Sequence, residues 1–152
     1  MTSATTPKTI ELYGMGCQHE DVATVAITPG YLIERNTAGV APHSTAGETA
    51  SPHFAVEMEM TGGTIDTDYA IGDQVVFKTY AAGSSVYALV AAGATAITNR
   101  AFLASDGDGT LRLASTDEIA IAQALEAVDN SGGATEARIK VEIIPAQRTA
   151  AA

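Results

Sequence analysis

The sequence predicts a mainly β protein: a compact β-barrel-like or β-sandwich-like domain built from two related halves, with an extended N-terminal arm and at most one short helix. The first observation is composition. Hydrophobic residues make up 46% of the chain but charged residues only 17%, whereas amphipathic helices need many long charged side chains. The second is that glycine-containing turns separate short apolar runs. The third is a strand-turn-strand pattern that recurs about 70 residues later.

The recurring pattern starts at Ile27 and again at Ile97. In register, the two stretches align apolar positions and a later glycine, and each is followed by a matching tripeptide and an alternating run. The matched pairs are Ile27-Thr28 with Ile97-Thr98, Leu32 with Phe102, Ile33 with Leu103, Gly39 with Gly109, Ala55-Val56-Glu57 with Ala124-Leu125-Glu126, and residues 73–80 with residues 137–144. An ordered series of matches indicates an internal duplication.

These matches define the expected domain organisation. Residues 1–10 form an extended N-terminal arm, residues 11–145 a single β domain, and residues 146–152 a C-terminal tail. Within the domain, the duplicated halves span approximately residues 22–80 and 90–144. Both ends lack the apolar content to fold alone, so we expect them to lie on a partner or on another copy.

Local turn chemistry supports the strands. Pro29-Gly30 suits a β-turn, because proline presets φ and glycine tolerates positive φ. Asp106-Gly107-Asp108-Gly109 predicts a hairpin between AFLAS and TLRLA, and Gly83-Ser84 predicts another between VVFKTY and SVYALVA. In residues 137–144, Ile139, Val141 and Ile143 alternate with charged residues, as in a half-buried strand.

One segment carries conflicting signals. Ser115 stands three residues before Glu118, as in the capping box at a helix start. However, Ile119 and Ile121 are β-branched and alternate with alanines, and the matching part of the first half, FAVEME, has the pattern of a strand. We therefore expect a strand here with at most one helical turn.

Charge and cysteine content exclude several functions. Eight Lys and Arg against eighteen Asp and Glu give a net charge of −10, and no basic run is present, so we expect no direct binding to DNA or RNA. No apolar run approaches the roughly 18 residues of a membrane span, and the first residues do not resemble a signal peptide. Cys17 is alone, so no intrachain disulfide can form. We expect a soluble protein kept in a reducing compartment.

The best candidate for catalysis is GGTIDTDYAIGD, residues 62–73. It resembles the substrate-binding hairpin of trimeric dUTP pyrophosphatases, in which an aspartate activates water and a tyrosine stacks beneath the sugar; the match would give these roles to Asp66 and Tyr69. That family's Pro-Arg-Ser-Gly segment and its glycine-rich phosphate-capping tail are missing from this sequence. The alternative is a β-turn around a buried Ile65, which we favour.

Other patterns indicate metal or nucleophile chemistry only weakly. Asp106 begins a run spaced like a calcium loop that would end at Asp117, but Leu111 and Leu113 occupy its interior. Cys17 and His19 stand close together, with His43 and His53 elsewhere, too few convergent residues to predict a zinc or nucleophile site. We expect Cys17 to be a buried or half-buried structural residue, and we predict no catalytic, cofactor or metal site.

The order of elements resembles the head decoration (capsid cement) proteins of tailed bacteriophages. The resemblance covers about Thr9 to Pro145 and includes His43. Its segments are TIELYGMGCQHEDV, AITPGYLIERNTAGV, TAGETASPHFAVEMEMTGGTIDTDYAIGDQVVF, GSSVYALVAAGATAITNRAFLASDGDGTLRL, IAQALEAVDNSGG and RIKVEIIP.

The resemblance implies a non-enzymatic protein of the virion that is made in the host cytoplasm. It would bind the major capsid protein on the outer surface of the expanded head, commonly as a homotrimer, without contacting nucleic acid or membrane. An N-terminal arm that orders on the capsid would correspond here to the residues Thr5, Thr6, Pro7, Lys8, Thr9 and Ile10. A dUTPase-like hydrolase and a generic β-barrel module for a ligand or carbohydrate remain the alternatives; the chain's five Tyr and three Phe, without Trp, count against a sugar site.

Overall fold

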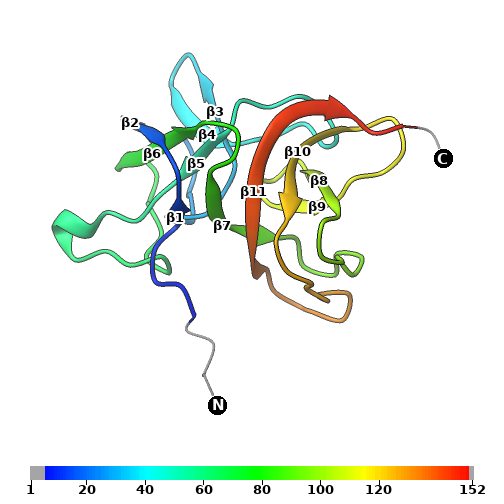
Figure 1. The fold of residues 1–152 in the computed structure, drawn as a ribbon. Helices are drawn as coiled ribbons and strands as arrows, with labels where there is room; N and C mark the ends of the chain where they lie inside the picture. The colour runs from blue at the N-terminus through cyan, green and yellow to red at the C-terminus, as the bar shows by residue number, and fades with distance from the viewer. Residues whose placement is uncertain (1–5, 151–152) are drawn as a thin grey trace.

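The structure is a computed structural model and describes residues 6–150 (Figure 1). It confirms the predicted mainly β fold, with 45% of residues in strands and 2% helical. The elements are β1 (Glu11–Tyr13), β2 (Gly16–Val22), β3 (Ile33–Asn36), β4 (Gly39–Pro42), β5 (His53–Ala55), the 3-10 turn η1 (Glu59–Thr61), β6 (Gln74–Tyr80), β7 (Ser85–Val90), β8 (Phe102–Ser105), β9 (Leu111–Leu113), β10 (Ile119–Ala124) and β11 (Ala137–Arg148).

The C-terminal half forms a closed ring of five strands, which we call the second ring. Its strands follow the order β7-β11-β10-β8-β9, and a parallel pairing between Val90 and Leu111 joins β9 back to β7. All the other pairings in the ring are antiparallel. The short strand β1 adds to the outside of β7. This ring lies on the right in Figure 1.

The N-terminal half forms a first ring with the same strand order. Strands β2, β6 and β5 make one sheet and β3 pairs with β4. Two single bridges connect these sheets into a ring: a parallel one between Ala23 and Val40, and an antiparallel one between Leu32 and Phe54. Thus β2–β6 correspond one by one to β7–β11. The duplication begins one strand earlier in each half than the sequence predicts.

Individual hydrogen bonds repeat between the rings. The Gly30 N–H donates to the Ala55 carbonyl at 2.8 Å, and the Arg100 N–H donates to the Ala124 carbonyl at 2.9 Å. Likewise Ile27 forms an antiparallel bridge to Tyr69, as Ile97 does to Val128. The predicted turn at Pro29-Gly30 is confirmed by a bond from the Tyr31 N–H to the Thr28 carbonyl, which the second ring repeats between Ala101 and Thr98. The matched pairs of the sequence thus occupy equivalent places, except that Gly39 corresponds to Thr110 rather than to Gly109, because Val40 and Leu111 make the equivalent bridges.

Each ring buries an apolar interior, and a further apolar layer joins the two. Ala23, Ile27, Ile33, Val40, Ala55, Tyr69, Val75 and Phe77 fill the first ring. A larger cluster contains the interior of the second ring, including Ile139, Val141 and Ile143 as the alternation predicted, together with Phe54, Val76 and Tyr80 from the outside of the first ring. The two rings therefore pack as one body.

Two local predictions need correction. The Gly83-Ser84 turn is not a hairpin, because β6 belongs to the first ring and β7 to the second, and these strands do not pair. It carries the chain between the rings, with the Gly83 N–H bonded to the Ile143 carbonyl. By contrast, the Asp106–Gly109 turn does join β8 to β9 as predicted, closed by a bond from the Asp106 N–H to the Thr110 carbonyl.

Residues 115–118 form a turn, and β10 follows it as the favoured alternative predicted. The Glu118 carboxylate accepts the Ser115 N–H, as in a capping box, but it also forms an ion pair with Arg112.

The last strand continues to Arg148, beyond the predicted start of a tail at residue 146, because Gln147 and Arg148 pair with β10. Within residues 6–150, no helix has the length and apolar character needed to cross a bilayer.

The equivalence of Gly30 and Arg100 makes a testable prediction. Both have positive φ, 101° and 70°, a conformation that strains any residue with a Cβ. Gly30→Ala should lower the free energy of unfolding by about 1 kcal/mol or more, because its Cβ would lie 2.8 Å from Nη1 of Arg138 and 3.0 Å from the Tyr87 carbonyl oxygen. Arg100→Gly should leave stability unchanged or raise it by up to about 1 kcal/mol.

Urea denaturation of both variants and the unchanged protein measures these differences. The only ion pair of Arg100 in residues 6–150 is a 4.0 Å contact with Glu142 on the surface, so its loss should cost little. A loss of stability in Arg100→Gly as large as that in Gly30→Ala would show that the two turns are not equivalent.

Candidate functional site

The segment that precedes β1 divides into an accessible part and an anchored part. Thr6, Lys8 and Thr9 are exposed and Pro7 is half-buried, whereas Ile10 is fully buried in the layer between the rings. The Ile10 carbonyl accepts the Tyr87 N–H at 2.8 Å. Of the residues predicted to form an interface, Thr6 to Thr9 are therefore available to a partner, Ile10 holds the segment in place, and Thr5 lies outside the described residues.

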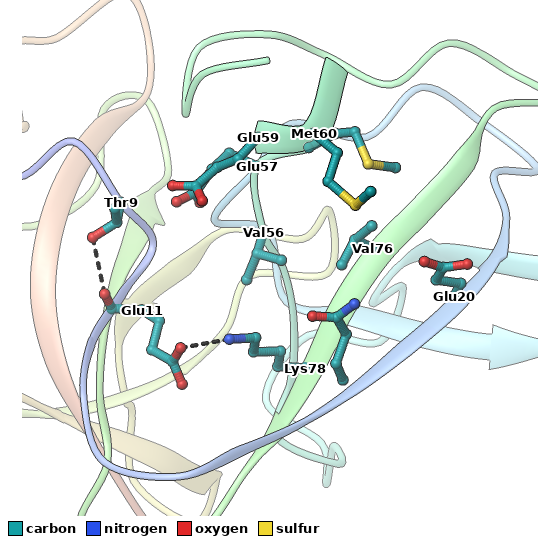
Figure 2. Close-up of a pocket in the computed structure, with 11 residues that line it drawn as sticks. Thr9, Glu11, Glu20, Val56, Glu57, Glu59, Met60, Val76 and Lys78 are labelled. Atoms are coloured by element: carbon teal, nitrogen blue, oxygen red, sulfur yellow. Dashed lines mark hydrogen bonds and ion pairs between the residues drawn. The ribbon is translucent and has the colours of Figure 1, made fainter. Parts of the chain in front are cut away.

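An acidic groove of about 250 Å³ lies beside this segment (Figure 2). It is lined by Thr9, Glu11, Gln18, Glu20, Val56, Glu57, Met58, Glu59, Met60, Val76 and Lys78. Figure 2 shows Glu57 and Glu59 on the side nearer Thr9, with Glu20 across Val76 from them. The residues come from β1, β2, β6 and the stretch from Val56 to Met60, so no single sequence motif marks the groove.

The groove has a negative potential. Lys78 is its one cationic side chain, and it forms an ion pair with Glu11. The Glu57 carboxylate accepts the Ile10 N–H at 3.1 Å and so helps to anchor the N-terminal segment. Among residues 6–150, none of Glu20, Glu57 and Glu59 has an ion-pair partner. Apolar side chains between the carboxylates make the groove suitable for long basic side chains, which combine an aliphatic stem with a charge.

Tyr80 lies close to the carboxylates of the groove but points into the apolar layer. Its side chain is 2% exposed, and its hydroxyl has no hydrogen-bond partner among the described residues. Burial, followed by the negative charges of Glu11 and Glu57, raises the pKa of the Tyr80 hydroxyl far above its ordinary value. Tyr80 is therefore a neutral packing residue at any physiological pH.

A second group of polar side chains surrounds Phe77 at the end of the first ring. The Arg35 guanidinium lies 5.1 Å from the ring centroid of Phe77, and the His19 and His53 rings lie 5.4 and 5.6 Å from it. Cys17 is exposed on β2, which contradicts the expectation of a buried or half-buried residue: it pairs with Thr79, beyond Phe77, the last β6 residue in the buried cluster of the first ring. In the part of the chain that the structure describes, no three His, Cys, Asp or Glu side chains group as metal ligands would.

The structure does not bring Asp66 and Tyr69 together as a hydrolase site. Tyr69 is buried in the first ring, and its hydroxyl donates to the Val56 carbonyl at 2.6 Å, so its face is not available to stack on a sugar. Asp66 is 82% exposed at its side chain and lies 3.4 Å from Arg138. Ile65 is buried, and Thr64 and Thr67 close a turn, in agreement with the structural alternative.

The other candidates have structural partners. Asp106 pairs with Arg112 at 2.9 Å, and Leu111 is fully buried, which is incompatible with the interior of a calcium loop. His43 is buried, and its Nδ1 lies 2.7 Å from the Ser105 hydroxyl. The Asp106–Arg112 pair stabilises the β8–β9 hairpin, and the His43–Ser105 contact links that hairpin to the first ring.

With this geometry established, comparison with known proteins adds no assignment. No protein-family model and no curated protein matches the sequence.

His53 should make stability depend on pH. Burial, then the positive Arg35, then His19 lower the pKa of His53 below 6.5. The unfolded chain therefore takes up a proton at a higher pH than the folded protein, and the contribution of neutral His53 to stability is lost as pH falls from about 6.5 towards the folded pKa. We expect His53→Gln to lose less stability than the unchanged protein between about pH 8 and about pH 5.

Urea denaturation at several pH values measures that difference. His43→Gln provides a comparison at a histidine bonded to Ser105 in the other half. An equal pH dependence in His53→Gln and the unchanged protein would contradict the assignment.

Proposed function

We propose that the chain is a non-enzymatic structural protein of a tailed-bacteriophage virion. It binds the major capsid protein on the outer surface of the expanded head and reinforces the shell against internal pressure. The proposal rests on the series of segments that resemble decoration proteins, because the same segments, in the same order along the chain, build the two rings. A doubled ring with a shared apolar layer is a rigid block, as a cementing protein requires.

The surface near the N-terminal segment supports a protein partner. Tyr13 and Met15, which flank Gly14, are 74% and 79% exposed, and neighbouring exposed apolar side chains often mark interaction sites. Met60 is 96% exposed in the groove that Thr9 also lines. Thr6 to Thr9 are accessible in the same region. Contacts of this size are weak singly, but repetition over a lattice makes them collectively strong.

The charge supports an outer location. A net charge of −10 repels the phosphates of packaged DNA, so binding on the outside of the shell avoids an unfavourable field. We further propose a homotrimer, the common state of the proteins it resembles, which sedimentation of the purified protein can measure.

The proposal predicts binding to expanded capsids that lack their decoration protein. Added protein should co-sediment with these capsids and raise the temperature at which they break open. A variant without residues 1–8 should fold normally, because the core begins at Ile10, yet bind capsids more weakly. Met60→Ala removes an exposed apolar side chain of the groove, and Ile71→Ala, a residue that is 72% exposed but does not line the groove, serves as the control.

Failure to bind the authentic capsid would overturn the proposal. So would turnover of dUTP with Mg²⁺ that is lost in Asp66→Asn, since that result would make the chain a hydrolase.

A further inference from the structure

The internal duplication reveals a strand position that no residue from 6 to 150 fills in the first ring. In the second ring, the outer edge of β7 is covered by the chain's own N-terminal segment: Glu11 pairs with Val86, and the Ile10 carbonyl accepts the Tyr87 N–H. In the first ring, the strand equivalent to β7 is β2. Strand β2 is the edge strand of its sheet: β4 meets its outer side only at the end, through the Ala23–Val40 bridge, and no described strand pairs with its outer side from Gly16 to Glu20.

The hydrogen bonds around β2 show which backbone groups face outwards. Beyond its end, the Ala23 N–H bonds to Asp73 on the β6 side, whereas the Thr24 N–H bonds to Val40 on the opposite side. Because the direction alternates along an antiparallel strand, the N–H and C=O groups of Gln18 and Glu20 point away from β6. We call this row the open edge of β2.

Because the rings are equivalent, β7 shows how a strand paired with the open edge of β2 would bind. Thr24 corresponds to Ala91, since their N–H groups bond to Val40 and Leu111, the two residues that bridge at the closure of each ring. Counting back along both strands, Glu20 corresponds to Tyr87. The N–H that binds Ile10 in the second ring therefore has a counterpart at Glu20 that lacks a strand partner in the first.

We propose that the open edge of β2 binds an extended basic segment of a partner protein as an added antiparallel strand. Strand addition to a free sheet edge is a common mode of peptide recognition. The antiparallel direction follows from β1, which adds to β7 in this direction. In assigning the segment to the major capsid protein, the inference rests on the proposed function; the edge itself is a property of the fold.

Charge determines which segment fits. Gln18 and Glu20 line the acidic groove, so every second side chain of an added strand would stand on the same sheet face beside them, at the rim of the groove. There, Glu20, Glu57 and Glu59 have no ion-pair partner among the described residues. Lys or Arg at alternating positions would place its charge beside Glu20, with Glu57 and Glu59 farther across the groove. A second copy of this chain, with net charge −10, is disfavoured at the same edge.

A synthetic seven-residue peptide, the length of β2, in which lysine alternates with valine, tests the edge directly. On titration, the backbone amides of Gln18 and Glu20 should show the largest NMR shifts and gain protection from hydrogen exchange. A peptide of the same sequence with alternate backbone amides methylated keeps the charge but cannot pair as a strand, and should bind at least about threefold more weakly. Equal binding by the two peptides, or shifts that avoid β2, would overturn the proposal.

Two pairs of variants separate the backbone from the charge. Gln18→Pro removes an outward N–H but no hydrogen bond to β6, and edge strands tolerate proline at such a position. This variant should weaken peptide binding about three- to tenfold. Gln18→Ala keeps the N–H and should bind the peptide as the unchanged protein does. Glu20→Gln should weaken binding and reduce its salt dependence, whereas Asp129→Asn, a charge loss in the other half, should not. Circular dichroism and urea denaturation check that each variant folds, and the methylated peptide decides the question if Gln18→Pro does not.

Capsid binding distinguishes this inference from the proposed function. Loss of binding in Gln18→Pro but not in Gln18→Ala supports the added strand. Equal binding by both folded variants overturns the added strand and leaves the capsid function in place. If the unchanged protein fails to bind capsids, the proposed function and the assignment of the segment to the capsid protein fail together, while the peptide result still decides whether the edge accepts a basic strand.

Discussion

The rest of the structure depends on one repeated contact, the hydrogen bonds between a tight turn and the fourth strand of each ring. At Gly30 the turn bonds to Ala55, and at Arg100 the same bond is made to Ala124. These bonds attach the β3–β4 and β8–β9 hairpins to β5 and β10, so that the Ala23–Val40 and Val90–Leu111 pairings can close each ring. Closure decides which face of every strand is enclosed. The first ring then encloses Val75 and Phe77. The opposite face of β6 is left to pack against the second ring, and that layer in turn buries Ile10 and positions the N-terminal segment.

The sequence predicts the parts of the fold that local chemistry determines. The Pro29-Gly30 turn, the Asp106–Gly109 hairpin and the alternation in β11 depend on neighbouring residues, and all are confirmed. The equivalence of β2 and β7 was missed for a physical reason. Strand β7 is covered on both sides and reads SVYALV, whereas β2 lies at an edge and reads GCQHEDV. The difference in burial has removed the sequence similarity. The Gly83-Ser84 turn was misassigned because a hairpin and a crossing between rings use the same local signals.

The candidate site was predictable only in part. The exposed residues Thr6 to Thr9 follow from their polar composition, but the anchoring of Ile10 depends on a pocket built by distant strands. The acidic groove gathers residues from four segments; the one local signal was the alternation of Glu57 and Glu59. Tyr69 shows the opposite error: its motif resembles a catalytic one, although the residue is buried in the first ring. Its counterpart in the second ring is Val128, which indicates that the position requires bulk in a core rather than chemistry.

The two rings differ most where their sequences have diverged in charge. A long exposed edge strand invites pairing between identical chains, and acidic side chains along such an edge oppose it. Glu20 supplies that opposition here, within a chain that is negative overall, and Glu57 and Glu59 add to the negative charge of the groove that Glu20 lines. In the proposed complex the same charges attract a basic segment, so a single feature would both oppose pairing of two copies at this edge and select a partner. In the second ring β1 already covers the edge, and Tyr87 and Val86 stand in buried positions on β7. The duplication thus produced one ring that is complete within the chain and one whose edge remains able to bind.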